Sequence, residues 1–189
     1  MKSLAFAALV AGTLSTAALA APESFTIDSG HTYPSFEIGH FGYSLQRGRF
    51  NKTSGKITVD AATRSGTADI TIDAATISTG NEKLEAHLKG EDFFNVARFP
   101  SITFKSKAFP VEGDVVKSVP GELTILGVTR PVTLTANQFK CADHPFAKKK
   151  ACGGDFVATI KRSEFGMKYA VPNVADDVTL RINVEAIKD

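Results

Sequence analysis

Three histidines in the first half of the chain carry its most versatile chemistry. His31, His40 and His87 would bind a metal ion if their side chains met in space, because imidazole nitrogen is a common metal ligand. They form no H-E-x-x-H pair or other close spacing that fixes two ligands on one element. His40 lies on the apolar face of "SFEIGH", where we expect a hydrogen-bonded side chain or a polar point in a cavity. We therefore predict no metal site.

Motifs for catalysis are absent from the sequence. It contains no G-x-S-x-G nucleophile elbow and no S-x-x-K pair, and the glycine spacing of "GRFNKTSGKI" does not fit a phosphate-binding loop. Asp28 and Glu37 are candidates for a carboxylate pair, but acidic side chains near turns and on outward faces are ordinary. The sequence therefore favours a protein that is not an enzyme. The alternative is an enzyme that uses His31, His40 or the nearby acids.

Cys141 and Cys152 are the two cysteines of the chain. In an exported protein such a pair is most simply one disulfide. Free thiols are one alternative. A metal site is another, because "CADH" and Cys152 supply two thiolates and His144, but a structural zinc site ordinarily has four ligands.

The N-terminal residues 1–20 indicate export. "MKSLAFAALVAGTLSTAALA" has one cation at Lys2, an uncharged apolar stretch and small residues at its end, which is the pattern of a secretory signal peptide. We expect cleavage after Ala20, which leaves residues 21–189 as a single domain that can bury a substantial core. No later segment has the apolar length of a membrane span, so we expect no stable membrane insertion. With 22 Lys and Arg against 20 Asp and Glu, the charge balance does not point to nucleic acid.

Most of residues 21–189 alternate between apolar and polar side chains. The clearest run is "VTLRINVEA", in which every second residue from Val178 to Ala186 is apolar. A period of two predicts half-buried strands of an antiparallel sheet. The same rhythm predicts further strands at 35–40, 56–60, 67–73, 101–106 and 131–136.

Turn-forming residues and one helical segment divide these runs. Clusters of Gly, Pro, Ser and acidic residues at 53–55, 64–66, 112–114 and 119–122 predict chain reversals. In "NEKLEAHLKG", Asn81 is a candidate N-cap, Leu84 and Leu88 lie four residues apart, and Gly90 can end a helix. The predicted fold class is all-β with one short helix. The alternation fits a sandwich and a closed barrel equally well.

Five blocks of the sequence resemble a known family. They are "SGHTYPSFEIGHFG", "RGRF", "HLKGEDFFNVARFPSITFKS", "GELTILGVTRPVTL" and "IKRSEFGM", and in this order they span nearly all of residues 24–186. The chain resembles the YceI-like family of exported polyisoprenoid-binding proteins. The resemblance implies a lipocalin-like antiparallel β-barrel of about eight strands, a bacterial periplasmic location, and an apolar tunnel that holds an isoprenoid chain. A barrel of eight strands has an interior wide enough for one slender ligand.

The alternation and the resemblance together indicate which residues should contact a ligand. Arg49, Arg130 and Arg162 lie in family-like blocks and are candidates for binding a polar headgroup; the alternative is that they are surface cations or pair with nearby acids. We expect no cofactor, and we expect an isoprenoid or other long-chain amphiphilic lipid as the partner. A homodimer and a stress-related secreted barrel with incidental lipid are left open. The side chains expected to line the tunnel are Phe36, Ile38, His40, Ile70, Ile72, Phe94, Ile102, Phe104, Leu134 and Leu180.

Overall fold

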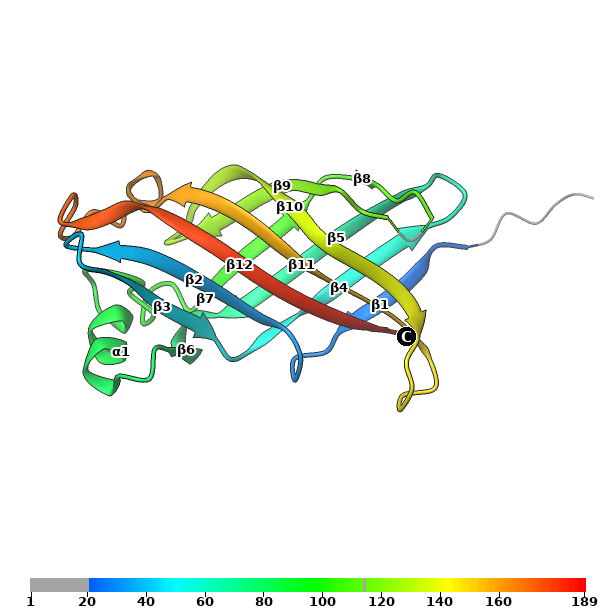
Figure 1. Ribbon diagram of the computed structural model, residues 1–189, viewed down its shortest axis with the longest axis horizontal. Coiled ribbons are helices and arrows are strands. Elements are labelled where there is room, and N and C mark those ends of the chain that lie inside the picture. Colours follow the sequence, from blue (N-terminus) through cyan, green and yellow to red (C-terminus); the bar gives the residue numbers. More distant parts are fainter. Residues whose placement is uncertain (1–20, 114) are drawn as a thin grey trace, which may run out of the picture.

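The computed structural model describes residues 21–113 and 115–189, and the predicted signal peptide lies outside them. These residues form a strongly curved antiparallel sheet with a short helix beside one end (Figure 1). The helix is α1 (Glu82–Lys89), and two 3-10 turns are η1 (Ala74–Thr76) and η2 (Arg162–Phe165). The strands are β1 (Glu23–Ile27), β2 (Tyr33–His40), β3 (Ser44–Phe50), β4 (Thr53–Asp60), β5 (Ser65–Asp73), β6 (Ile77–Ser78), β7 (Ser101–Ser106), β8 (Phe109–Pro110), β9 (Ser118–Ile125), β10 (Val128–Asp143), β11 (Lys150–Lys161) and β12 (Val174–Lys188).

Eight of these strands close into a barrel. Following the hydrogen bonds, their order is β1, β4, β5, β7, β9, β10, β11 and β12, and β12 returns to β1 through the pair Phe25 and Lys188. Only the last residues of β12 reach β1. The rest of that strand, from Val174 to Asn183, pairs with β2, and the sheet continues from there into β3 and β6. The predicted antiparallel barrel of about eight strands is therefore confirmed, and the sandwich is excluded.

The predicted helix is also confirmed, together with its cap. The Asn81 side-chain oxygen accepts a hydrogen bond from the Leu84 N–H at 3.2 Å, which satisfies a donor that the first turn leaves free. The Gly90 N–H donates to the His87 carbonyl at the other end. Within residues 21–113 and 115–189, no helix has the length and apolar character needed to cross a membrane.

Two of the four predicted turns are wrong. Residues 53–55 lie within β4 and residues 119–122 lie within β9. A Cβ atom on Gly121 would lie 2.5 Å from Cζ of Phe104, which comes from the neighbouring strand β7. That glycine therefore serves the close approach of a ring and does not mark a reversal. The cluster at 64–66 and residues 112–113 of the third cluster do adjoin turns, where Arg64 and Gly113 have φ values of 52° and 64°, while residue 114 lies outside the described residues.

A small apolar cluster fills the end of the barrel at which β1 meets β12. It consists of Phe25, Ile27, Cys152 and Ala186, and the side chains of Phe25 and Ala186 are fully buried. The C-terminus lies at this end, whereas α1 lies at the opposite one (Figure 1). The two ends of the barrel thus differ, and the closed end is the one held by β1.

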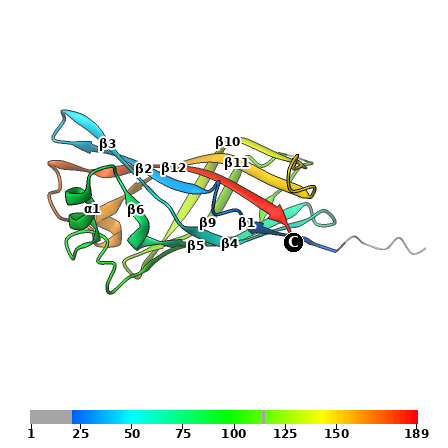
Figure 2. The same ribbon diagram turned by 90° about the horizontal axis from the view of Figure 1, so that it is seen from below.

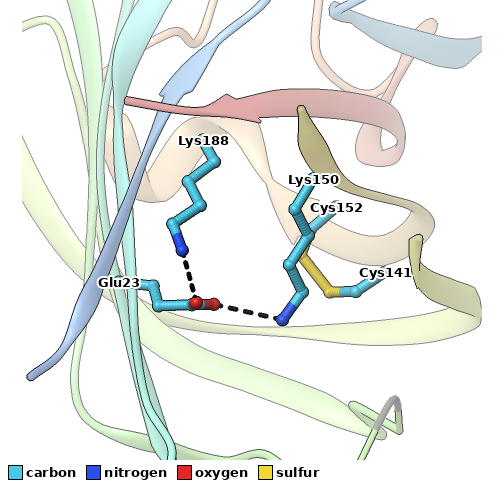
Figure 3. The surroundings of a disulfide bond; sticks show 5 residues. All are labelled: Glu23, Cys141, Lys150, Cys152 and Lys188. Atoms are coloured by element: carbon cyan, nitrogen blue, oxygen red, sulfur yellow. Dashed lines mark hydrogen bonds and ion pairs between the residues drawn. A yellow bond between two sulfur atoms is a disulfide. The ribbon is translucent and has the colours of Figure 1, made fainter. Parts of the chain in front are cut away.

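A disulfide and a shared carboxylate tie the strands together at the closed end. Cys141 of β10 and Cys152 of β11 face each other across the sheet and are joined, which confirms the predicted pairing. Beside them, the Glu23 carboxylate accepts hydrogen bonds from Nζ of Lys188 at 2.6 Å and from Nζ of Lys150 at 3.1 Å (Figure 3). These two lysines hold the pKa of Glu23 below its usual range. Glu23 thereby links β1 to both β12 and the start of β11.

Candidate functional site

A cavity of about 660 Å³ lies inside the barrel. Its wall is mostly apolar and is built by side chains from β2, β3, β4, β5, β7, β9, β10, β11 and β12, with α1 beside one end. The volume falls within the range of roughly 300–1,000 Å³ that is typical of small-molecule sites. An interior of this kind receives an apolar ligand without requiring a specific polar partner, because removing apolar surface from water is favourable.

Each of the ten side chains expected to line a tunnel does line this cavity. The period of two explains why, because Ile70 and Ile72 of β5 lie opposite Phe104 and Ile102 of β7 and all four turn inward. Their contact with a ligand stays a prediction. The ten residues are Phe36, Ile38, His40, Ile70, Ile72, Phe94, Ile102, Phe104, Leu134 and Leu180.

Phenylalanine rings of the wall rest on glycines of neighbouring strands. Phe36 lies opposite Gly48, and Phe109 lies opposite Gly66. A Cβ atom on either glycine would come within 2.5 Å of the ring, as it would at Gly121 beneath Phe104. A ring that rests on bare backbone lies along the wall and leaves the lumen free. These glycines were not predicted from the sequence as part of the site. They could be found from the sequence where a phenylalanine of one strand lies beside a glycine of the neighbouring strand.

The cavity reaches solvent at the end that carries α1. Phe41, in the turn between β2 and β3, and Tyr169, in the loop after η2, both line the cavity, yet they are 51% and 48% exposed. Side chains that border both the cavity and the solvent mark its opening. Figure 2 shows the β2–β3 turn, the loop after η2 and α1 together at this end. The mouth therefore lies between these three segments.

Aromatic contacts join two sides of the mouth. The His87 ring of α1 packs edge-on against Phe93 at 4.9 Å and against Tyr169 at 5.4 Å between centroids. Nε2 of His87 also lies 3.2 Å from a carboxylate oxygen of Asp92. The helix is thus connected to the loop after η2 through side chains that also line the cavity.

The histidines do not converge on one site. His40 and His87 line the cavity, whereas His31 lies outside its wall and pairs with Asp28 at 2.8 Å, which raises the pKa of His31. Asp28, His31 and Glu185 form the one group of His, Cys, Asp or Glu in residues 21–113 and 115–189 whose potential ligand atoms lie within 4.8 Å of one another. All three belong to the outer surface at the start of β2, away from the cavity.

Of the three arginines considered for a headgroup, one belongs to the cavity wall. The Arg49 guanidinium lies 4.5 Å from the centre of the Tyr33 ring, and Arg130 donates to the carbonyl of Thr129. Neither of these arginines lines the cavity, whereas Arg162 does. The structure therefore gives no support to a headgroup role for Arg49 and Arg130.

Arg162 is a buried cation held by backbone. Its guanidinium donates to the carbonyls of Val174 and Ala175 at 2.9 Å and of Met167 at 3.1 Å. Burial lowers the pKa of Arg162, and the nearby Asp176 opposes that shift. Three of the five guanidinium N–H groups are used in this way, so two are left for another partner.

Thr53 is another polar residue of the cavity wall, and it was not predicted from the sequence. Its side chain is buried and lines the cavity, and its hydroxyl is the one buried side-chain polar atom without a hydrogen-bond partner among the described residues. A hydroxyl in that position can donate to a carbonyl or hydroxyl of a bound molecule.

Comparison with known proteins agrees with this architecture. The model of the YceI-like domain matches residues 25–186. A UPF0312 protein from Pseudomonas aeruginosa is 35% identical over 186 residues, which cover 96% of each chain. The crystal structure of BcnA from Burkholderia cenocepacia has a TM-score of 0.69 and 27% identity, and the match covers 85% of this chain and 99% of that one. A polyisoprenoid-binding domain from Saccharophagus degradans, implicated in plant cell wall breakdown, shares the fold with a TM-score of 0.63 and 16% identity over 87% of this chain and 98% of its own. The chain belongs to the YceI-like family.

Proposed function

We propose that the protein binds the chain of an isoprenoid or similar long-chain amphiphilic lipid inside its barrel and acts as a carrier. The apolar cavity, open at one end and closed at the other, is the observation that carries this proposal. Membership of the YceI-like family and the likeness to a polyisoprenoid-binding domain support it. The ten predicted wall residues would contact the lipid chain.

The energetics of such a site need no polar anchor. Removing an apolar carbon group from water contributes about 0.8 kcal/mol per CH₂. A few isoprene units in the cavity would therefore give strong attraction, and the cost of ordering a flexible chain would offset part of it. Moderate net affinity suits a carrier, which must also release its ligand.

A binding role fits the placement of the polar groups better than catalysis does. Of the groups considered for an enzymatic mechanism, His31, Asp28 and Glu37 lie outside the cavity wall, whereas His40 lines it. Glu37 instead accepts hydrogen bonds from Arg47 at 2.8 Å and from Arg181 at 3.0 Å. A lipid inside the barrel would meet His40, but no Asp or Glu of the described residues lines the cavity beside it.

We also propose that the chain is exported to the periplasm, where residues 21–189 act as a single lipid-binding domain. The N-terminal sequence pattern supports export. The disulfide between Cys141 and Cys152 supports an oxidising compartment, because structural disulfides persist there.

Arg162 is the residue that we propose for contact with a polar headgroup. It is buried in the wall and keeps two N–H groups, so it would attract a phosphate. We expect the wild-type protein to bind a prenyl phosphate more tightly than the matching prenol. Arg162→Met also leaves the carbonyls of Met167, Val174 and Ala175 without their donor, so we expect a loss of stability, and affinity for the phosphate should fall by about 1.5–3 kcal/mol more than affinity for the prenol. Equal wild-type affinities for the two ligands would show that the headgroup stays in water.

Organic extraction of the purified protein followed by mass spectrometry tests the proposed function. The protein should be produced with its signal peptide and isolated without detergent. We expect a prenyl or quinone-like species in stoichiometric amount. A mixture of ordinary membrane lipids far below one per chain would indicate incidental lipid and count against the proposal.

A further inference from the structure

The rim of the cavity mouth carries an exposed apolar patch. We define the mouth rim as Phe41, Tyr43, Leu45, Tyr169 and Val171, which are all exposed large hydrophobic residues. Tyr43 is 91% exposed and Leu45 53% exposed. They come from two segments far apart in the sequence, which a hydrogen bond from the Phe41 N–H to the Asn173 carbonyl at 2.8 Å brings together. Such a patch around an opening marks an interaction surface.

We propose that the mouth rim docks reversibly on the surface of an anionic lipid bilayer, so that the cavity opens directly onto the membrane. This inference rests on the proposed function and adds the place at which the ligand enters and leaves the barrel. Aromatic side chains with a polar tip, such as Tyr43 and Tyr169, are suited to the headgroup region of a bilayer. Docking of this kind is peripheral and requires no spanning segment.

The charges of the two rim segments favour an anionic surface. Residues 38–47 contain Arg47, residues 166–175 contain Lys168, and neither range contains an acidic residue. Both cations are exposed. Glu37 neutralises part of the charge of Arg47, and Lys168 has no carboxylate within 4.0 Å among the described residues. The third segment at the mouth, α1 with the loop after it, carries Glu82, Glu85, Glu91 and Asp92 against Lys83 and Lys89, so the two rim segments and not α1 would face the bilayer. Cations next to exposed apolar side chains attract a surface of anionic headgroups while the apolar side chains insert.

The rim is continuous with the cavity wall. Phe41 and Tyr169 belong to both, so a lipid chain leaving a bilayer under the rim would meet apolar side chains at each step. The same chain would have to cross water if the mouth faced solvent, and that exposure is unfavourable. The closed end offers no such path, because Phe25 and Ala186 fill it.

A second copy of the chain is the other occupant to consider. In a two-fold symmetric contact each copy presents the same surface, so the rim segments with Arg47 and Lys168 of one copy would approach the same cationic segments of the other. Like charges at an interface oppose association. The bilayer is therefore the occupant that the charges favour, and self-association becomes an outcome of the test.

Flotation with lipid vesicles tests the proposal, using phosphatidylethanolamine with phosphatidylglycerol as the anionic surface and phosphatidylcholine as the neutral one. We expect the protein to float with the anionic vesicles and to dissociate as salt rises. The double variant Tyr43→Ser/Leu45→Ser should lower binding by about tenfold or more, because it removes the most exposed apolar groups. Lys168→Gln should weaken binding to anionic vesicles only.

Phe146→Ser is the matched control. Phe146 is 89% exposed and lies in the turn between β10 and β11, beside Lys148 to Lys150, so it has the same character as the rim but belongs to the closed end. We expect this variant to bind vesicles like the wild type. A loss with Phe146→Ser and none with Tyr43→Ser/Leu45→Ser would place the docking surface at the wrong end and overturn the proposal.

Two further measurements separate docking from ligand binding. Tyr43 and Leu45 do not line the cavity, so their double variant should still take up a prenol from detergent solution. Wild-type protein that loads prenol but ignores anionic vesicles would refute docking and leave lipid binding intact. Wild-type protein that binds anionic vesicles but takes up no prenol would support docking and refute lipid binding. Sedimentation that shows a dimer lost in the double variant, with no vesicle binding, would assign the rim to self-association instead.

Discussion

Phe36, Phe104 and Phe109 each rest on a glycine of a neighbouring strand, and this arrangement explains how a barrel rich in phenylalanine keeps an open interior. An aromatic ring above an ordinary side chain would have to project into the lumen. Above glycine it can lie along the sheet. The width of the cavity therefore depends on residues that have no side chain.

Replacing Gly48 with alanine tests this dependence. The new Cβ would lie 2.5 Å from Cζ of Phe36, and its three nearest atoms would be side-chain atoms of Phe36 and Thr79, so we expect the ring to swing into the cavity. We expect a folded protein that is less stable by about 1–3 kcal/mol and binds a long prenol more weakly in calorimetric titration. Gly39→Ala is the control, since its Cβ would meet only Ala175 at 3.3 Å. Equal prenol affinities of the two variants would contradict this role for Gly48.

Glu23 makes the free energy of unfolding depend on pH. Lys188 and Lys150 lower its pKa in the folded state. The contribution of Glu23 to the free energy of unfolding is therefore fully present above its pKa in the unfolded chain, about 4.3. This contribution is lost as the pH falls through the lower pKa of the folded state. We expect Glu23→Gln to reduce the free energy of unfolding by about 0.5–1 kcal/mol at pH 7. Chemical denaturation should show this difference shrinking below about pH 4; a difference that stays constant down to pH 2 would rule the linkage out.

At the scale of elements, alternation predicted β2, β4, β5, β7, β10 and β12, whereas β1, β3, β9 and β11 were not predicted and two of the four predicted turns were wrong. Alternation places Ile70, Phe104 and Leu180 on the inner face, because a period of two reflects burial on one side of a sheet. Glycine and proline clusters were ambiguous, since glycine serves both reversals and close packing. "VPGE" lies inside β9 because Gly121 accommodates the Phe104 ring, a contact that depends on which strands are neighbours. That pairing information is not local in the sequence, and for the same reason the unpartnered Thr53 hydroxyl could not be foreseen.

The hairpin of β10 and β11 depends on its disulfide. Cys141 and Cys152 are separated by 11 positions, and closing a loop of this size contributes roughly 3 kcal/mol in the chain-entropy model. We expect the double variant Cys141→Ala/Cys152→Ala to unfold at lower denaturant concentration by about that free energy. Titration of denatured, unreduced wild-type protein should detect almost no free thiol. Two reactive thiols per chain would contradict the bond.

At the scale of the whole molecule, the barrel has two different ends. One end is closed by β1, the disulfide and the contacts of Glu23 with Lys188 and Lys150. The opening at the other end is surrounded by the β2–β3 turn, α1 and the loop after η2 (Figures 1 and 2). A cavity with one opening is suited to binding a chain-like ligand and releasing it through the same opening. The periodic sequence pattern predicts strands with one inward face, but the difference between the ends follows from the short pairing of β1 with β12.

The central claim is that a lipid chain occupies the barrel, and a matched pair of neighbouring substitutions on β5 tests it most directly. Ile70 points into the cavity and Thr71 is exposed on the outer face of the same strand. Native mass spectrometry of detergent-free protein should show one bound lipid in the wild type and in Thr71→Asp. The lipid should be absent from Ile70→Asp, because a carboxylate cannot be buried against an apolar chain without a large cost. Lipid retained by Ile70→Asp at the wild-type level, with both variants folded by circular dichroism, would contradict the claim that the cavity holds it.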